Sequence, residues 1–133
     1  MPHLVILYTA NLEPDTDMTA LCRTMADTML AVRDDAGQQL FPPGGTRVYA
    51  YPAAHYAVAD SQRDYAFVYL NVRMAPGRPE AVKQRVGDAM LAAAKAHLGP
   101  AFEQRPIGLT LQIDDAPAVY DGKHNTINPL FAR

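Results

Sequence analysis

The chain alternates between short apolar runs and longer segments with helical spacing. Residues 4–8 form a continuous apolar run, which predicts a strand buried on both faces. A polar loop follows, in which Thr16 or Asp17 is placed to cap a helix. After this helix and a turn-rich stretch over residues 41–45, residues 48–51 predict a short second strand. The helix itself is predicted from an apolar stripe of six residues: Met18, Leu21, Cys22, Met25, Met29 and Val32.

The same order of elements then occurs a second time. Residues 66–74 predict a strand, and a second helix is predicted to open at Pro79 and to stop at the Gly99–Pro100 pair. Residues 107–114 alternate between apolar and polar side chains, which predicts a half-buried strand. The tail, residues 116–133, is predicted to be irregular, with room for short hairpin strands. The stripe of the second helix comprises Val82, Val86, Ala89, Met90, Ala93 and His97.

Two successive strand–helix–strand units predict an α+β fold. We expect one domain over residues 1–133, whose units, about 1–62 and 63–133, share a four-stranded sheet with both helices on one face. The opposite face also needs cover, because the first strand is apolar throughout and the third adds Phe67 and Tyr69. Self-association is the simplest cover, so the pattern predicts an oligomer.

Composition and charge exclude several classes of protein. Of the 133 residues, 49% are hydrophobic and 20% are charged, as in ordinary globular proteins. The formal net charge of -2 gives no general attraction to nucleic acid, and we expect no nucleic-acid partner. No apolar run reaches membrane-spanning length, and the start lacks the basic region of a signal peptide. With a single cysteine that suits a reducing compartment, a cytoplasmic protein without membrane attachment is expected.

Pro2 is the first candidate for chemistry. The initiator Met1 is ordinarily removed in front of proline, which would leave a free secondary amine at the start of a buried strand. An α-amino group titrates closer to neutrality than lysine, and desolvation or nearby cations would lower its pKa further, toward that of a general base. The alternative is that proline at position two is common and has no function. The apolar strand that follows Pro2 favours a catalytic role, because it would anchor the N-terminus in the fold.

Two arginines are the next candidates. Arg78 directly precedes the second helix, where a cation is unfavourable unless an anion lies between its guanidinium and the free N–H groups of the first turn. Arg47 follows two glycines and enters the second strand, from where it could reach across a pocket mouth. The alternatives are a solvated Arg78 and a loop Arg47 that pairs with Asp34 or Asp35.

The sequence contains no motif typical of a metal-binding or cofactor-binding site. The histidines His3, His55, His97 and His124 lack metal-ligand spacing, and a zinc site is not expected with one cysteine. Cys22 lies on an apolar stripe and is interpreted as a core residue rather than a nucleophile. No glycine-rich phosphate loop, Ser-His-Asp order or paired-carboxylate motif occurs, so we expect neither cofactor nor metal.

Several short motifs occur in order along essentially the whole chain. They are residues 1–6 (MPHLVI), 41–42 (FP), 45–47 (GTR), 64–68 (DYAFV), 77–78 (GR) and the closing stretch 125–131 with its Leu130–Phe131 pair. In this combination the chain resembles the 5-carboxymethyl-2-hydroxymuconate isomerase family of the tautomerase superfamily. The resemblance implies a tautomerase-like fold of two strand–helix–strand units, assembled as a homotrimer.

The resemblance also implies a cofactor-free isomerisation in the degradation of homoprotocatechuate-type aromatic compounds. Pro2 would take the 2-hydroxyl proton of a dienol acid such as 5-carboxymethyl-2-hydroxymuconate, and a proton would return at carbon to give the conjugated 2-oxo acid. Arg47 and Arg78 would hold or polarise the carboxylate and oxo groups of this small anionic substrate. A substrate with several negative charges requires more than one cation to bind it.

Parts of the chain depart from the family pattern. Residues 7–10, the segment 33–40, residues 51–56 and Arg73 differ, and these differences concern the substrate more than the mechanism. Two alternatives therefore stay open: a tautomerase-fold protein that acts on another unsaturated acid, and a non-catalytic oligomer that binds small molecules. The sequence also leaves open which subunit of the trimer supplies each arginine.

Overall fold

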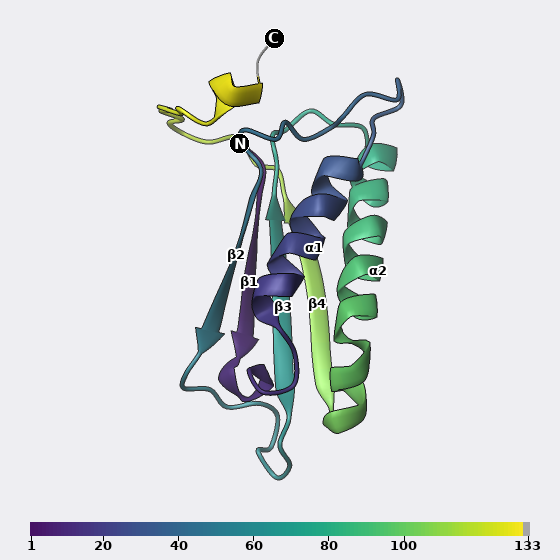
Figure 1. The fold of residues 1–133 in the computed structure, drawn as a ribbon, viewed down its shortest axis with the longest axis vertical. Coiled ribbons are helices and arrows are strands. Elements are labelled where there is room, and N and C mark those ends of the chain that lie inside the picture. The colour runs from purple at the N-terminus through teal and green to yellow at the C-terminus, as the bar shows by residue number, and fades with distance from the viewer. Residues whose placement is uncertain (132–133) are drawn as a thin grey trace.

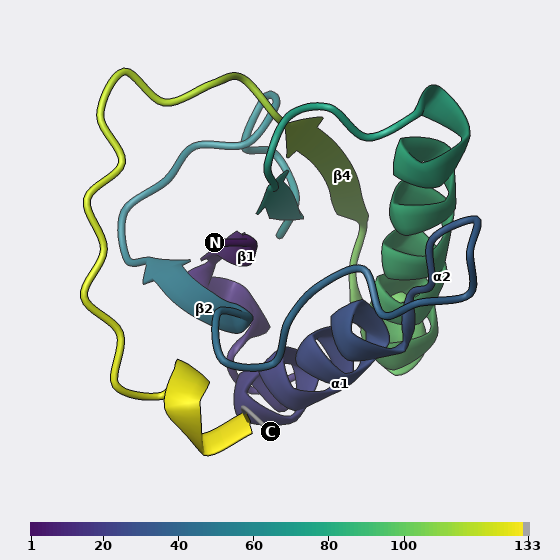
Figure 2. The same ribbon diagram turned by 90° about the horizontal axis from the view of Figure 1, so that it is seen from above.

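A four-stranded mixed sheet carries both α-helices on one face (Figures 1 and 2). The computed structural model describes residues 1–131. The strands follow the order β2-β1-β3-β4 across the sheet. The elements in chain order are β1 (His3–Thr9), the 3-10 helix η1 (Ala10–Leu12), α1 (Met18–Ala31), β2 (Arg47–Ala53), β3 (Ala66–Arg73), α2 (Glu80–Gln104), β4 (Ile107–Asp114) and the 3-10 helix η2 (Asn128–Phe131).

The sheet is built from two β-α-β units. Strands β1 and β2 pair in parallel and are joined by α1, and strands β3 and β4 pair in parallel and are joined by α2. The two units meet through the antiparallel pairing of β1 with β3 in the centre of the sheet. Asp17 caps α1 by accepting a hydrogen bond from the backbone N–H of Ala20 (3.0 Å). The predicted α+β fold and the Asp17 cap are confirmed.

One hydrophobic core fills the space between the sheet and the helices. Alternate residues of β1 and β3 point to the helices and are fully buried, as the period of two along a strand requires. Burying each large side chain contributes roughly 1.5–3 kcal/mol of hydrophobic free energy. The contributors with no exposed surface include Leu4 and Ile6 of β1, Val68, Leu70 and Val72 of β3, Leu21, Met25 and Met29 of α1, and Val86, Met90 and Leu98 of α2.

The face of the sheet opposite the helices is open in the single chain. Leu7, Tyr49, Tyr51 and Phe67 are each more than two-fifths exposed there. The prediction that the first strand is buried on both faces is therefore wrong for one chain, because both helices pack on the same side. An apolar, partly aromatic sheet face of this kind is typical of a surface that another chain covers.

The second helix is longer than predicted, because Gly99 and Pro100 do not stop it. Helix α2 continues to Gln104 with Pro100 inside it, although proline removes one backbone hydrogen bond. Leu98 and Ala101, on either side of that proline, are both buried. Their packing against the core holds the chain helical beyond the position at which local propensity favours a stop.

The tail contains no strand in residues 115–131. The short hairpin strands that the sequence left room for are therefore not formed in these residues. The tail leaves β4 at one edge of the sheet and crosses, near the N-terminus, to the side of β2 (Figure 2). Asn125 stabilises a turn in the tail, because its side-chain oxygen accepts hydrogen bonds from the N–H groups of Ile127 and Asn128 (2.7 and 2.9 Å). Side-chain bonds to the local backbone replace strand pairing in this segment.

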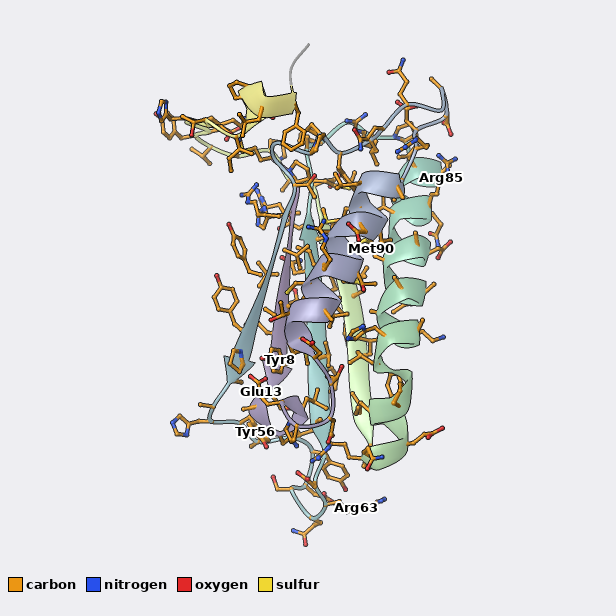
Figure 3. All side chains as sticks on the ribbon, viewed as in Figure 1. Tyr8, Glu13, Tyr56, Arg63, Arg85 and Met90 are labelled. Carbon is orange, nitrogen blue, oxygen red and sulfur yellow. The ribbon has the colours of Figure 1, made fainter. Side chains whose placement is uncertain are left out.

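Tyr8 is expected to make stability depend on pH in the alkaline range. Burial raises the pKa of Tyr8 to about 12, helped by the hydrogen bond that its hydroxyl donates to Glu13 (2.6 Å; Figure 3). In the unfolded chain a tyrosine titrates near pH 10, so unfolding between pH 10 and 12 releases a proton. The stabilisation is complete below pH 10 and is lost as the pH rises toward 12. At pH 11 the loss is about 1 kcal/mol.

Urea unfolding at pH 8 and pH 11 measures this contribution. The wild-type protein should lose about 1 kcal/mol more between the two pH values than the Tyr8→Phe variant. Tyr56→Phe, which removes the hydroxyl of an exposed tyrosine, is the matched control and should behave as wild type. An equal loss in Tyr8→Phe and wild type would contradict the assignment.

Candidate active site

The N-terminus, two loops and the tail meet at one end of the sheet (Figure 1). Pro2 directly precedes β1 and is buried. It lines a cavity of about 360 Å³ together with Arg78, which lies in the loop between β3 and α2. The walls between them are largely apolar and include Leu40, Phe41 and Met74. The structure therefore places two of the three residues singled out from the sequence at one cavity.

A tight turn sets the position of Arg78. The preceding Gly77 has a φ of +98°, in the left-handed region that only glycine adopts at little cost. Apart from Gly77 itself and its two chain neighbours, no residue has a heavy atom within 4 Å of where a Cβ would be, so backbone conformation rather than space requires glycine here. The turn leaves Arg78 exposed at the cavity, immediately before Pro79, the cap of α2.

Arg47 approaches the N-terminus from the neighbouring strand. It is the first residue of β2 and lies opposite His3 in the sheet. Its Nη1 donates hydrogen bonds to the carbonyl oxygens of Gly45 (2.9 Å) and Pro2 (3.4 Å). The alternative that Arg47 pairs with Asp34 or Asp35 is wrong. Asp35 pairs instead with Arg85 (2.9 Å), and Asp34 accepts the backbone N–H groups of Ala36 and Gln38.

A second cavity, of about 330 Å³, lies on the other side of Met1. His3, Arg47, Arg73 and Lys123 line it. Four residues line both cavities: Met1, Met74, Ala75 and Lys123. The two cavities are therefore neighbours, and Met1 is one of the residues between them.

The loop before β2 packs closely on the N-terminus and on the tail. A Cβ on Gly45 would lie 3.3 Å from Met1 Cγ and 3.8 Å from Pro2 Cδ, so glycine allows this approach. A Cβ on Gly44 would overlap Asn128 of the tail. Asn125 also donates a hydrogen bond from Nδ2 to the Gly44 carbonyl oxygen (3.0 Å). These contacts hold the tail, including Lys123, beside the cavities.

His3 lies among cations and is held neutral by its surroundings. Burial lowers the pKa of His3, while the contact of Nδ1 with the Met1 carbonyl oxygen (3.4 Å) opposes this shift. The positive charges of Arg47, the amino terminus and Arg73 lower the pKa further. The imidazole of His3 therefore adds little to the positive charge around the N-terminus at neutral pH.

Sequence reasoning singled out Pro2, Arg47 and Arg78 but missed Arg73 and Lys123 as cavity residues. Arg73 ends β3, and the antiparallel pairing of β3 with β1 places it opposite His3. Knowing the order of the strands in the sheet would have placed Arg73 beside the N-terminus. The hydrophobic pattern alone does not determine that order. Lys123 lies in the irregular tail, where no periodic signal exists.

Across residues 1–131, no three or more His, Cys, Asp or Glu side chains are grouped so that they could share a metal ion. In the same residues, neither α-helix is both long and apolar enough to cross a membrane.

Two β-α-β units on one sheet form a tautomerase-like fold, with a proline directly before the first strand and arginines around it. The chain belongs to the 5-carboxymethyl-2-hydroxymuconate isomerase family, whose model matches residues 2–131. This confirms the family that the sequence motifs indicated.

Known proteins of this family are similar to the chain over almost its whole length. A crystal structure of a 5-carboxymethyl-2-hydroxymuconate delta-isomerase is 54% identical, with a TM-score of 0.96 over 100% of this chain and 94% of that chain. A 5-carboxymethyl-2-hydroxymuconate isomerase from Deinococcus radiodurans R1 is 34% identical, with a TM-score of 0.87 over 99% and 95% of the two chains. The Escherichia coli 5-carboxymethyl-2-hydroxymuconate Delta-isomerase is 25% identical over 98% of this chain and 99% of its own.

Proposed function

We propose that this chain is an isomerase of 2-hydroxydienoic acids such as 5-carboxymethyl-2-hydroxymuconate, in the degradation of aromatic compounds. The observation that carries the proposal is the placement of Pro2, buried at a cavity that Arg78 lines and in contact with Arg47. Membership of the isomerase family supports it. The product is the conjugated 2-oxo acid, and the reaction needs only the movement of a proton.

In this proposal Pro2 is the base once Met1 has been removed. Its secondary amine takes the proton from the 2-hydroxyl group, the C2–O bond becomes a carbonyl, and the double bonds shift along the chain. The proton returns to the far end of the former diene, at C5, so that the remaining double bond is conjugated with the new carbonyl. Substrate and product are isomers, and the amine is regenerated with each turnover.

The surroundings of Pro2 favour the unprotonated amine. Leu40, Phe41 and Met74 make the cavity walls apolar, and desolvation disfavours an ammonium ion. The guanidinium groups of Arg47 and Arg78 disfavour a further positive charge in the same way. An α-amino group ordinarily titrates near pH 8, so a modest lowering of its pKa brings it to the pH at which a base is most effective.

The two arginines act on the negative charge of the substrate. As the hydroxyl proton leaves, charge develops on the 2-oxygen, and a guanidinium already in position stabilises it without reorganisation. We assign this role, together with binding of the adjacent carboxylate, to Arg78 at the Pro2 cavity. Arg47, fixed by two carbonyl oxygens, holds the N-terminus and contributes positive charge from the second cavity.

We further propose that residues 1–133 act as one domain within a cytoplasmic homotrimer. A single core spans both β-α-β units, which supports one domain. The open sheet face with Leu7, Tyr49, Tyr51 and Phe67 supports burial against other copies of the chain. A lone cysteine, half-buried against the core, suits a reducing compartment.

A spectrophotometric assay of ketonisation tests the proposed function. Protein whose mass shows the loss of Met1 is mixed with a small panel of 2-hydroxymuconates and 2-hydroxydienoates. Loss of the dienol absorbance faster than in buffer, with the conjugated 2-oxo acid as product, is the expected result. A different product from an unsaturated acid would favour another reaction on the same fold. No turnover of any compound by processed, folded protein would favour a non-catalytic binding protein.

A further inference from the structure

We propose that Arg85 of α2 is a positioning residue, which holds the segment after α1 in place and with it an apolar wall of the cavity that Pro2 lines (the Pro2 cavity). Arg85 lines neither of the two cavities described above. It therefore acts through the residues that it holds and does not touch the substrate. For its effect on the reaction the inference rests on the proposed function.

The segment after α1 begins with a hairpin over residues 33–39. Arg33 and Gln39 form an antiparallel bridge at its ends. Inside the hairpin, the N–H of Asp34 donates to the carbonyl oxygen of Gln38 (2.9 Å), and the Asp34 carboxylate accepts the N–H of Gln38 (2.9 Å). Because these bonds join the two arms to each other, we expect the hairpin to move as one unit. Its position is then set by the contacts that join it to the rest of the fold.

Arg85 binds this hairpin at two points. Its Nη1 donates to the carbonyl oxygen of Arg33 (2.9 Å), and its Nη2 pairs with the carboxylate of Asp35 (2.9 Å). The planar guanidinium fixes the direction of both bonds, and the bond to a carbonyl oxygen restrains the backbone itself. In residues 1–131, Arg85 makes all the hydrogen bonds and ion pairs between the hairpin and α2. Figure 3 shows Arg85 near the start of α2, beside the hairpin.

The hairpin leads directly into the Pro2 cavity. Leu40 and Phe41 follow it in the chain, line the cavity and are each 3% exposed. The N–H of Leu40 donates to the carbonyl oxygen of Val32 (3.1 Å), so the wall begins where the hairpin is closed. A displacement of the hairpin is therefore passed to Leu40 and Phe41 through the chain itself.

A second part of the cavity wall belongs to the start of the helix that holds the hairpin. Arg78 lines the cavity and directly precedes Pro79, the N-cap of α2. Arg85 lies roughly 7.5 Å along the helix axis from Glu80, the first residue of α2. Seen from above, the segment after α1 crosses to α2 before it returns to β2 (Figure 2). Arg85 thus sets the spacing between Arg78 and the apolar wall with Phe41.

Loss of Arg85 should loosen this wall without unfolding the protein. The side chains of Arg85 and Asp35 are 45% and 64% exposed, and exposed ion pairs contribute little to global stability. The hairpin would then move against α2, and Leu40 and Phe41 with it, so that water reaches the cavity. Water stabilises an ammonium ion, which raises the pKa of the Pro2 amine. The base is then protonated, and inactive, up to a higher pH.

The pH profile of kcat/KM tests this prediction on protein that has lost Met1. Arg85→Ala should shift the acid limb upward by about 0.5 pH unit, which lowers kcat/KM about threefold there and leaves the alkaline plateau unchanged. Asp35→Ala should shift the limb in the same direction. Loss of the Asp35 charge alone would lower the pKa of a nearby amine, so a common upward shift separates a loosened wall from a change of charge. Arg23→Ala, which breaks an exposed ion pair with Asp27 on α1, is the control and should keep the wild-type profile.

Two further measurements do not depend on turnover. Hydrogen exchange in residues 32–41 should be about threefold faster in Arg85→Ala than in wild type or Arg23→Ala. Trace labelling with acetic anhydride gives the pKa of the Pro2 amine, which should rise as far as the acid limb does. Asp35→Ala keeps the bond from Arg85 to the backbone and serves alone if Arg85→Ala does not fold. All three variants retain the charged and titratable side chains that line the two cavities: His3, Arg47, Arg73, Arg78, Asp121 and Lys123.

Several outcomes would overturn the inference. A uniform loss of kcat/KM across the pH range is one, and faster exchange with an unchanged acid limb and labelling profile is another, since Arg85 would then only support the loop. Opposite shifts in Arg85→Ala and Asp35→Ala would also overturn it. An absence of turnover in the wild-type protein would contradict the proposed function instead. The labelling profile then decides alone: a higher pKa of the Pro2 amine in both variants supports the inference, and an unchanged pKa overturns it.

Discussion

Replacement of Pro2 by alanine is expected to lower kcat about 10²-fold for a 2-hydroxydienoate substrate. Alanine also permits removal of Met1, so the variant keeps a free amine at the same end of the sheet. That amine is primary, has more rotational freedom and is less well placed than the proline nitrogen, which the ring and the buried start of β1 hold fixed. We expect KM to change little, because the arginines that bind the substrate are retained.

Steady-state kinetics compare the wild-type protein with Pro2→Ala, in samples whose mass shows complete loss of Met1. The control is Pro129→Ala, which makes the same substitution in the exposed tail and should retain wild-type kcat. Near-native kcat in fully processed Pro2→Ala protein would remove Pro2 as the base. Circular dichroism of both variants ensures that a loss of activity does not reflect unfolding.

Replacement of Arg78 by alanine is expected to lower kcat/KM by roughly 10²–10³-fold, the loss typical when a donor to a developing oxyanion is removed. Both parameters should change, with a lower kcat and a higher KM, because Arg78 is assigned to the carboxylate and to the 2-oxygen at once. The side chain is exposed in a loop and makes no ion pair in residues 1–131, so its removal should not destabilise the fold.

Arg78→Lys separates charge from geometry at this position. Lysine keeps the positive charge but lacks the planar fork of donors that binds a carboxylate with two hydrogen bonds. We expect Arg78→Lys to have a higher kcat/KM than Arg78→Ala, mostly because its KM is lower. Arg63→Ala, at the opposite end of the molecule, controls for loss of charge (Figure 3). An Arg78→Ala variant with more than half of wild-type kcat/KM would contradict the assignment.

The order and type of the main elements could be predicted because each follows from a local period. The stripe from Met18 to Val32 gave α1, and the alternation after Ala66 and Ile107 gave β3 and β4. The end of α2 could not be predicted in this way. Local propensity favoured a stop at Pro100, but the burial of Leu98 and Ala101 depends on how the helix lies against the sheet.

The candidate site was only partly accessible from the sequence. Pro2, Arg47 and Arg78 each stand beside a feature that is visible locally: a terminus, a glycine pair and a helix start. Arg73 lies at the site because β3 pairs antiparallel with β1. Lys123 lies there because the tail is hydrogen-bonded to the Gly44 carbonyl oxygen. Both placements depend on contacts between residues far apart in the chain, which periodicity does not encode.

The most direct test of the central claim compares one protein before and after removal of Met1. Protein purified with Met1 in place is assayed, treated with methionine aminopeptidase and assayed again, while its intact mass gives the processed fraction. In the proposed mechanism the Pro2 nitrogen is an amide before treatment and a base afterwards. The kcat/KM should therefore rise by about 10²–10⁴-fold, in proportion to the processed fraction. Equal activity before and after complete removal of Met1 would contradict the role of Pro2.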